Sequence, residues 1–173
     1  MNITRTCPAN SRDRVKWLKL RELPERDAQA ENVRHLANVL REASGGNRRL
    51  FVALCHCVAR DGIRFVSDVA RVGHEDIAGL TRPYADPLEA LERGTDDCDA
   101  KGRLLVALLL AGGIGARLVD WWDKTNGDLD HVAAECMLDG RWVHLETILS
   151  RARIGDEPQQ VPVEPSTGKW AYS

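Results

Sequence analysis

Residues 97–113 read DCDAKGRLLVALLLAGG and form the most hydrophobic segment of the chain. An aspartate at its start is a preferred helix N-cap, and paired glycines at its end are typical of a helix terminus. The leucine, valine and alanine residues between them leave almost no polar face, so the helix belongs in the interior of a domain. We therefore expect a central buried helix over 97–111, with Cys98 in its first turn.

Downstream of this helix, the pattern changes from a helical period to a strand period. The candidate strands are GARLVDWW (115–122), HVAAECML (131–138) and RWVHLET (141–147). Asn126-Gly127 and Asp139-Gly140 stand between them, and both dipeptides favour tight hairpin turns. The three segments therefore predict an antiparallel meander.

Upstream of residue 97, the pattern predicts helices first. The expected elements are a helix over 27–43, a helix over 47–62, an extended segment over 63–66, a loop over 67–85 and a short helix from Pro87 to Gly94. Asp27 is the candidate N-cap of the first helix. The second helix would turn the following residues inward: Leu50, Phe51, Leu54, Cys57 and Val58. Helices followed by antiparallel strands are typical of the α+β class.

Length and composition set the class of protein. The chain has 173 residues, of which 43% are hydrophobic and 29% charged, and we expect one domain over 1–173. Its core would cover about 27–150, and 151–173 would be a C-terminal extension. The longest apolar run, Leu104 to Ala111, is far shorter than the ~20 residues of a transmembrane helix, and the N-terminus carries no apolar signal segment. We therefore expect a cytoplasmic protein with no membrane partner.

Charge and cysteine usage exclude further classes. Residues 1–64 carry 13 basic and 7 acidic side chains, but the arginines alternate with apolar residues, as on solvated helix faces, so no nucleic-acid partner is expected. The five cysteines are odd in number and scattered, which indicates reduced thiols. Cys55, His56 and Cys57 are adjacent on a helix and diverge, so we expect two core thiols and a surface imidazole there. No metal and no cofactor are expected.

Cys98 differs from the other cysteines because it lies at a helix N-terminus. Unpaired N–H groups there lower the pKa of a thiol and can hold an oxyanion. Asp96, Asp97 and Asp99 act in the opposite direction, so activation requires a cationic partner, for which histidine is the best candidate. If Cys98 is catalytic, we expect a thiol pKa well below that of a free cysteine.

The predicted hairpin supplies that histidine. With a two-residue turn at Asp139-Gly140, His131 and Glu146 share one sheet face as diagonal neighbours, roughly 7 to 8 Å apart. A slip of one residue would turn both into the core. His144 opposite Glu135 is a rival pair, closer to the turn.

These residues resemble the transglutaminase-like superfamily of papain-related thiol enzymes, of the bacterial cysteine peptidase type. The resemblance covers roughly 50–148 and rests on G-T-D-D-C-D before a helix ending G-I-G-A-R, then H-V-A-A-E, then D-G-R-W-V-H-L-E. The 33 residues from Cys98 to His131 and 15 more to Glu146 fit the family. The resemblance implies a papain-like fold, with N-terminal helices and the buried helix packed on an antiparallel sheet. It implies that Cys98 is the nucleophile, that His131 is the acid and base, and that Glu146, where the family mostly has Asp, orients the imidazole.

The implied reaction is acyl transfer on a peptide or protein amide, and hydrolysis is favoured. Candidates for a second oxyanion donor or a cleft wall are Tyr84, Trp121, Trp122 and Trp142. Two alternatives stay open: a weakly active or inactive module that binds or assembles proteins, and a true protein cross-linking transglutaminase. The sequence does not determine the substrate or the oligomeric state.

Overall fold

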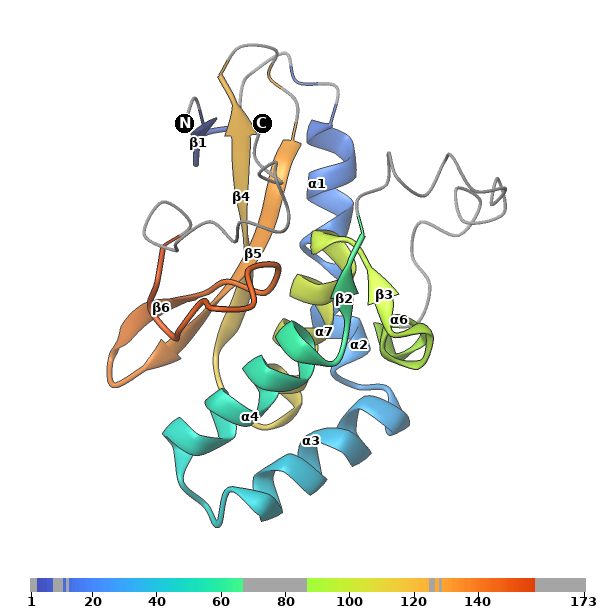
Figure 1. Ribbon diagram of the computed structural model, residues 1–173, viewed down its shortest axis with the longest axis vertical. Coiled ribbons are helices and arrows are strands. Elements are labelled where there is room, and N and C mark those ends of the chain that lie inside the picture. The colour runs from blue at the N-terminus through green and yellow to red at the C-terminus, as the bar shows by residue number, and fades with distance from the viewer. Residues whose placement is uncertain are drawn as a thin grey trace.

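The computed structural model describes residues 3–7, 11, 13–66, 87–124, 127 and 129–157 (Figure 1). Its elements are β1 (Ile3–Thr4), α1 (Arg14–Leu20), α2 (Leu23–Asp27), α3 (Glu31–Ala43), α4 (Arg48–Asp61), β2 (Arg64–Phe65), α6 (Pro87–Arg93), β3 (Thr95–Asp96), α7 (Cys98–Ala111), β4 (Ala116–Asp123), β5 (Leu129–Leu138) and β6 (Arg141–Leu145). Most helices precede the antiparallel sheet, which confirms the α+β class. The expected loop over 67–85 lies outside the described residues. Among the helices described, none has the length and apolarity needed to cross a membrane.

Helix α7 is buried at the centre, as its sequence predicts. The Asp97 carboxylate caps it by accepting a hydrogen bond from the Ala100 backbone N–H at 3.1 Å. Six consecutive residues, 104–109, are fully or almost fully buried. The helix packs against β4 and β5 on one side and against α2, α3, α4 and α6 on the others. This packing holds the Cys98 end of α7 against the sheet.

Gly102 sets how closely α7 approaches the sheet. A Cβ atom at this position would lie 3.2 Å from Leu118 Cδ2 and 3.5 Å from Val132 Cγ1, at or inside ordinary van der Waals distance. Gly102 lies one turn after Cys98, and Val132 follows His131 in the chain. The glycine therefore brings the helix that carries Cys98 close to the strand that carries His131.

The main sheet has the strand order β1-β4-β5-β6, and all its neighbouring strands are antiparallel. Glu135 pairs with His144, which is the register that a two-residue turn predicts. The turn residues Asp139 and Gly140 have φ angles of 53° and 78°, as a type I′ turn requires. The predicted hairpin and its register are therefore confirmed.

Buried cations of α7 anchor it to the N-terminal helices. Arg103 is buried and donates through Nε to the Asp27 carboxylate at the end of α2. Lys101 is buried as well, and its Nζ donates to the backbone carbonyls of Arg60, at 2.9 Å, and of Ile63. Burial lowers the pKa of Lys101 to about 8. Both contacts fix α7 relative to the elements that precede the sheet.

The prediction of one helix from Asp27 is wrong. The chain forms α2 up to Asp27 and begins α3 at Glu31, with Ala30 at the N-cap position and no side-chain cap. The Asp27 carboxylate binds Arg103 instead of capping α3. Since Arg103 is 76 residues away in sequence, local pattern could not show this competition.

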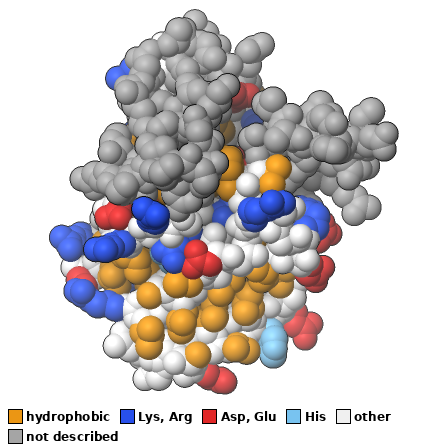
Figure 2. Space-filling view, viewed as in Figure 1, with side chains coloured by type: hydrophobic (Ala, Val, Ile, Leu, Met, Phe, Trp, Pro, Cys, Tyr) orange, Lys and Arg blue, Asp and Glu red, His pale blue; other side chains and the backbone are white. Residues whose placement is uncertain are grey.

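Helix α4 is confirmed, and the Asn47 side chain caps it, but its buried face differs from the predicted one. Its buried residues are Phe51, Val52, Cys55, His56 and Ala59. Leu50 is 44% exposed and Cys57 is exposed, whereas both were expected to point inward. Hydrophobic side chains gather on the outer face over α3 and α4 (Figure 2). Helix α4 has apolar residues at helical spacing on two faces, so its tertiary contacts determine which face is buried.

Candidate active site

Cys98 is the first residue of α7, at the helix end where backbone N–H groups have no intrahelical partner. Its side chain is partly buried, and its sulfur lies 3.7 Å from Asp99 Oδ1. The Asp99 carboxylate is in turn paired with Lys16 Nζ at 2.9 Å. The nucleophile candidate is therefore held between the helix terminus and an ion pair.

The pKa of the Cys98 thiol is raised well above its ordinary value. Burial is the main cause, and the negative charges of Asp99 and Asp97 add to it. A hydrogen bond from the Val132 backbone and the charge of Lys16 lower the pKa but do not compensate. The expected low pKa is thus not met, because desolvation and the aspartates outweigh the helix terminus. The resting thiol is neutral.

His131 and Glu146 form the predicted pair. His131 Nε2 lies 2.9 Å from Glu146 Oε2, and the two side chains are 1% and 0% exposed. Although burial raises the pKa of Glu146, its interaction with His131 and the hydrogen bonds to the carboxylate hold this pKa well below its usual range. The carboxylate is therefore ionised and accepts the Nε2 proton.

The backbone after β6 fixes the other oxygen of Glu146. Glu146 Oε1 accepts hydrogen bonds from the N–H groups of Thr147, at 2.7 Å, and Ile148, at 2.9 Å. One carboxylate oxygen thus binds the chain and the other binds His131. Since Glu146 occupies Nε2, Nδ1 is the ring nitrogen that would take a proton from a thiol.

Cys98 and His131 belong to adjacent parts of α7 and β5. The sulfur is within hydrogen-bonding reach of the Val132 backbone, the residue that follows His131. The predicted register holds, yet both His131 and Glu146 are buried rather than open to a cleft. The structure thereby places the nucleophile candidate beside the His131 strand and joins the other two residues by a hydrogen bond.

His56 on α4 is a site residue that sequence reasoning missed. It was expected at the surface but is only 2% exposed. Its Nε2 lies 2.6 Å from the backbone carbonyl oxygen of Glu146, so Nε2 carries the proton and donates it. Burial lowers the pKa of His56, which keeps the ring neutral. No local signal in the sequence links residues 56 and 146. The only available signal is that His56 lies four residues after Val52 and three before Ala59, which puts it on their buried helix face.

Replacing this histidine tests its role. We expect His56→Phe, which keeps a ring but removes the donor, to lower the free energy of unfolding by about 1–3 kcal/mol, because the Glu146 carbonyl loses its partner. Urea unfolding followed by circular dichroism measures this. Cys57→Ala, one residue along on the exposed side, should stay within about 0.5 kcal/mol of wild type. Equal losses in the two variants would contradict the assignment.

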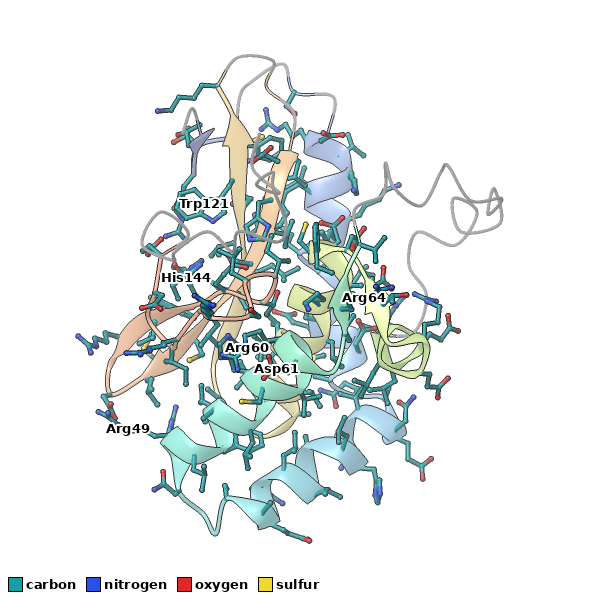
Figure 3. The ribbon with its side chains drawn as sticks, viewed as in Figure 1. Arg49, Arg60, Asp61, Arg64, Trp121 and His144 are labelled. Atoms are coloured by element: carbon teal, nitrogen blue, oxygen red, sulfur yellow. The ribbon has the colours of Figure 1, made fainter. Side chains whose placement is uncertain are left out.

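The rival pair of His144 and Glu135 does not form. Glu135 accepts from Arg5 at 2.6 Å and from Arg117 at 2.7 Å. His144 instead has its Nε2 4.0 Å from Glu146 Oε2, too long for a hydrogen bond. Figure 3 shows His144 on β6 and Trp121 on β4, and their rings meet edge to face with centroids 6.3 Å apart.

The aromatic candidates separate clearly. Trp121 pairs with His131 across β4 and β5, is buried, and its indole N–H has no hydrogen-bond partner among the described residues. Trp122 donates its indole N–H to Asp120 and packs in the core. Trp142 is 41% exposed beneath the Arg117 guanidinium, 4.0 Å from the ring centroid. Tyr84 lies outside the described residues. Trp121 is therefore the best-placed donor beside His131.

Metal ligation has no support in the part of the chain that the structure describes. No group of three or more His, Cys, Asp or Glu side chains there could hold a metal ion. Cys55 and His56 are buried and Cys57 is exposed, so the expected pair of core thiols with a surface imidazole is wrong for two of the three. The buried face of α4 includes His56 and not Cys57, which explains both errors.

Comparison with known proteins gives one family match that spans this site. Residues 63–147 match the sequence profile of the transglutaminase-like superfamily, and this range contains Cys98, His131 and Glu146. None of the curated proteins compared with the chain matches it.

Two solved structures are similar to this chain, and the first shares its fold. A crystal structure of a candidate protease from Parabacteroides distasonis superposes with a TM-score of 0.54 and 17% identity, over 73% of this chain and 25% of that one. The periplasmic domain of TgpA from Pseudomonas aeruginosa gives a TM-score of 0.46 and 16% identity, over 75% of this chain and 48% of that one. The chain therefore spans only part of either protein. The expected papain-like α+β fold is confirmed by the family match and the first of these structures.

Proposed function

We propose, from the match of residues 63–147 to the transglutaminase-like superfamily, that this chain is a cysteine peptidase or amidase that hydrolyses a peptide or protein amide. One observation carries the proposal. His131, on the strand beside the Cys98 end of a buried helix, forms a buried hydrogen bond with Glu146, which follows β6. A buried ionised carboxylate on one imidazole nitrogen favours a base at the other nitrogen.

The proposed reaction has two halves. Cys98 Sγ attacks the amide carbonyl carbon while His131 Nδ1 takes the thiol proton. The tetrahedral intermediate collapses, the C–N bond breaks, and the leaving amine takes that proton from His131. Water then attacks the thioester with His131 as base, which releases the acid and restores the thiol. Glu146 stabilises the imidazolium in both halves and stays ionised.

A neutral resting thiol fits this sequence of steps. The raised pKa of Cys98 means that the proton leaves as the C–S bond forms, as it does for a serine nucleophile. The Cys98 backbone N–H at the α7 terminus would hold the oxyanion, and the Trp121 indole N–H is our candidate for the second donor.

The P. distasonis protein, named as a candidate protease, gives modest support for hydrolysis. Two alternatives follow from the raised thiol pKa and from the family. A module that binds or assembles proteins without turnover would keep Cys98 neutral, and a cross-linking transglutaminase would pass the acyl group to an amine. The cytoplasmic location, the absence of cofactor and nucleic-acid partner, and the single domain over 1–173 stay predictions.

The molecule that accepts the acyl group, water or an amine, distinguishes these functions. We expect the full chain to cleave members of a peptide library, with mass spectrometry showing products that contain added water, and a fluorescent primary amine should be incorporated into none of them. Cys98→Ala should show neither product. Amine incorporation at glutamine would establish cross-linking, and the absence of any Cys98-dependent product would favour the binding module.

A further inference from the structure

The N-terminal segment contacts residues beside both Cys98 and His131. Helix α1 is held to the core by Trp17 and Leu20, which are 7% and 3% exposed. Near its start, Asp13 Oδ2 accepts a hydrogen bond from the Leu129 backbone N–H at 2.9 Å, two residues before His131. One turn later, Lys16 Nζ pairs with Asp99 at 2.9 Å, one residue after Cys98.

β1 adds contacts at the same site. Its Thr4 pairs with Trp122 of β4, and Arg5 lies over the Trp121 ring, 5.3 Å from its centroid. These residues precede 63–147, so they are outside the part of the chain that matches the family. The sequence that precedes the family core is thereby tied to the Cys98 helix, to the His131 strand and to Trp121.

We propose that α1 is a positioning element of this site, in which Lys16 neutralises the carboxylate beside the Cys98 sulfur and Asp13 fixes the start of the His131 strand. The proposal rests on the proposed function, which it deepens. Without Lys16, the Asp99 carboxylate, whose Oδ1 lies 3.7 Å from the sulfur, would be an uncompensated negative charge next to a nucleophile that must become anionic. Lys16 thus stabilises the charge that develops on sulfur.

The charged groups that act on the sulfur come from two segments. Asp99 lies in α7 and Asp97 caps its start, whereas Lys16 belongs to α1. Asp99 and Asp97 raise the pKa of the thiol and Lys16 lowers it, so the directions agree with the geometry. Asp13 instead contacts the backbone of Leu129, at the start of the strand. The two anchors are therefore separable by experiment.

The pH dependence of Cys98 alkylation by iodoacetamide, read by mass spectrometry of its peptide, tests Lys16 without requiring any peptide turnover. We expect Lys16→Met to slow alkylation at neutral pH about three- to tenfold and to shift its pH profile upward. Lys16→Arg should restore the wild-type rate. Asp99→Asn should speed alkylation, and Lys16→Met combined with Asp99→Asn should return to within about twofold of wild type, because both charges are then gone.

Lys19→Met is the matched control, since Lys19 lies exposed on the same helix. An unchanged profile in Lys16→Met, an equal slowing in Lys19→Met, or a failure of Asp99→Asn to rescue would overturn the role of Lys16. Asp13→Ala should leave the pH profile of alkylation unchanged, and it should lower kcat for peptide cleavage with little change in KM. A shifted alkylation profile, or an unchanged kcat in an active enzyme, would overturn the role of Asp13 in fixing the His131 strand. If no peptide is cleaved at all, the proposed function fails while the alkylation result still stands.

Discussion

Cys98→Ala is expected to lower peptide hydrolysis by about 10⁴-fold or more while the chain stays folded. The covalent step requires sulfur, and nothing else at the α7 terminus can replace it as a nucleophile. The substitution removes one partly buried sulfur from the start of a well-capped helix, so thermal unfolding should shift by only a few degrees. Turnover of a cleaved library peptide and circular dichroism measure the two effects.

Cys57→Ala is the control for this variant, because Cys57 is exposed on α4 and away from the site. It should keep wild-type activity and stability. Wild-type activity in Cys98→Ala would remove Cys98 from the mechanism. A collapse of the fold would instead show that the residue is structural, and Cys98→Ser would then decide: it keeps the shape and should still be nearly inactive.

Glu146→Gln is expected to cost about 10⁴-fold in kcat, comparable to removing the orienting carboxylate of a serine protease triad. An amide can keep the two backbone hydrogen bonds of Glu146 Oε1, but its NH₂ group faces His131 Nε2 and donates. Nε2 must then accept, which moves the ring proton to Nδ1 and blocks the base. Steady-state kinetics should therefore show a loss in kcat rather than in KM.

Glu135→Gln is the matched control, since Glu135 is a buried glutamate on the same strand as His131 but pairs with arginines. It should affect stability more than kcat. Equal losses of kcat in the two variants would mean that buried carboxylates support only the fold. A Glu146→Gln enzyme with normal kcat would show that His131 does not need this partner.

Much of the fold could be predicted because its signals are local. The apolar stretch of α7 with its Asp97 cap and the Asp139-Gly140 turn each determine an element from adjacent residues. The turn also determines the register, and the register puts His131 and Glu146 on one face. The pairing of His131 with Glu146 could therefore be predicted from the strand register, and the family resemblance implies the same pairing.

The parts that could not be predicted depend on contacts between distant segments. Asp27 binds Arg103 instead of capping a helix, and His56 is buried against the carbonyl of Glu146, 90 residues away in sequence. The thiol pKa of Cys98 depends on how far the sulfur is desolvated, and a sequence does not report burial of a single atom. The contacts of α1 with α7 and β5 are long-range for the same reason.

In the proposed reaction, Cys98 forms a covalent acyl intermediate with the help of His131. The most direct measurement is to incubate the full chain with a peptide ester, quench it with acid and locate the added acyl mass by mass spectrometry. We expect a thioester on Cys98 alone, formed much more slowly in His131→Gln and absent in Cys98→Ala. Acylation that is absent, or that falls on the exposed Cys57 and is unaffected by the loss of His131, would contradict it.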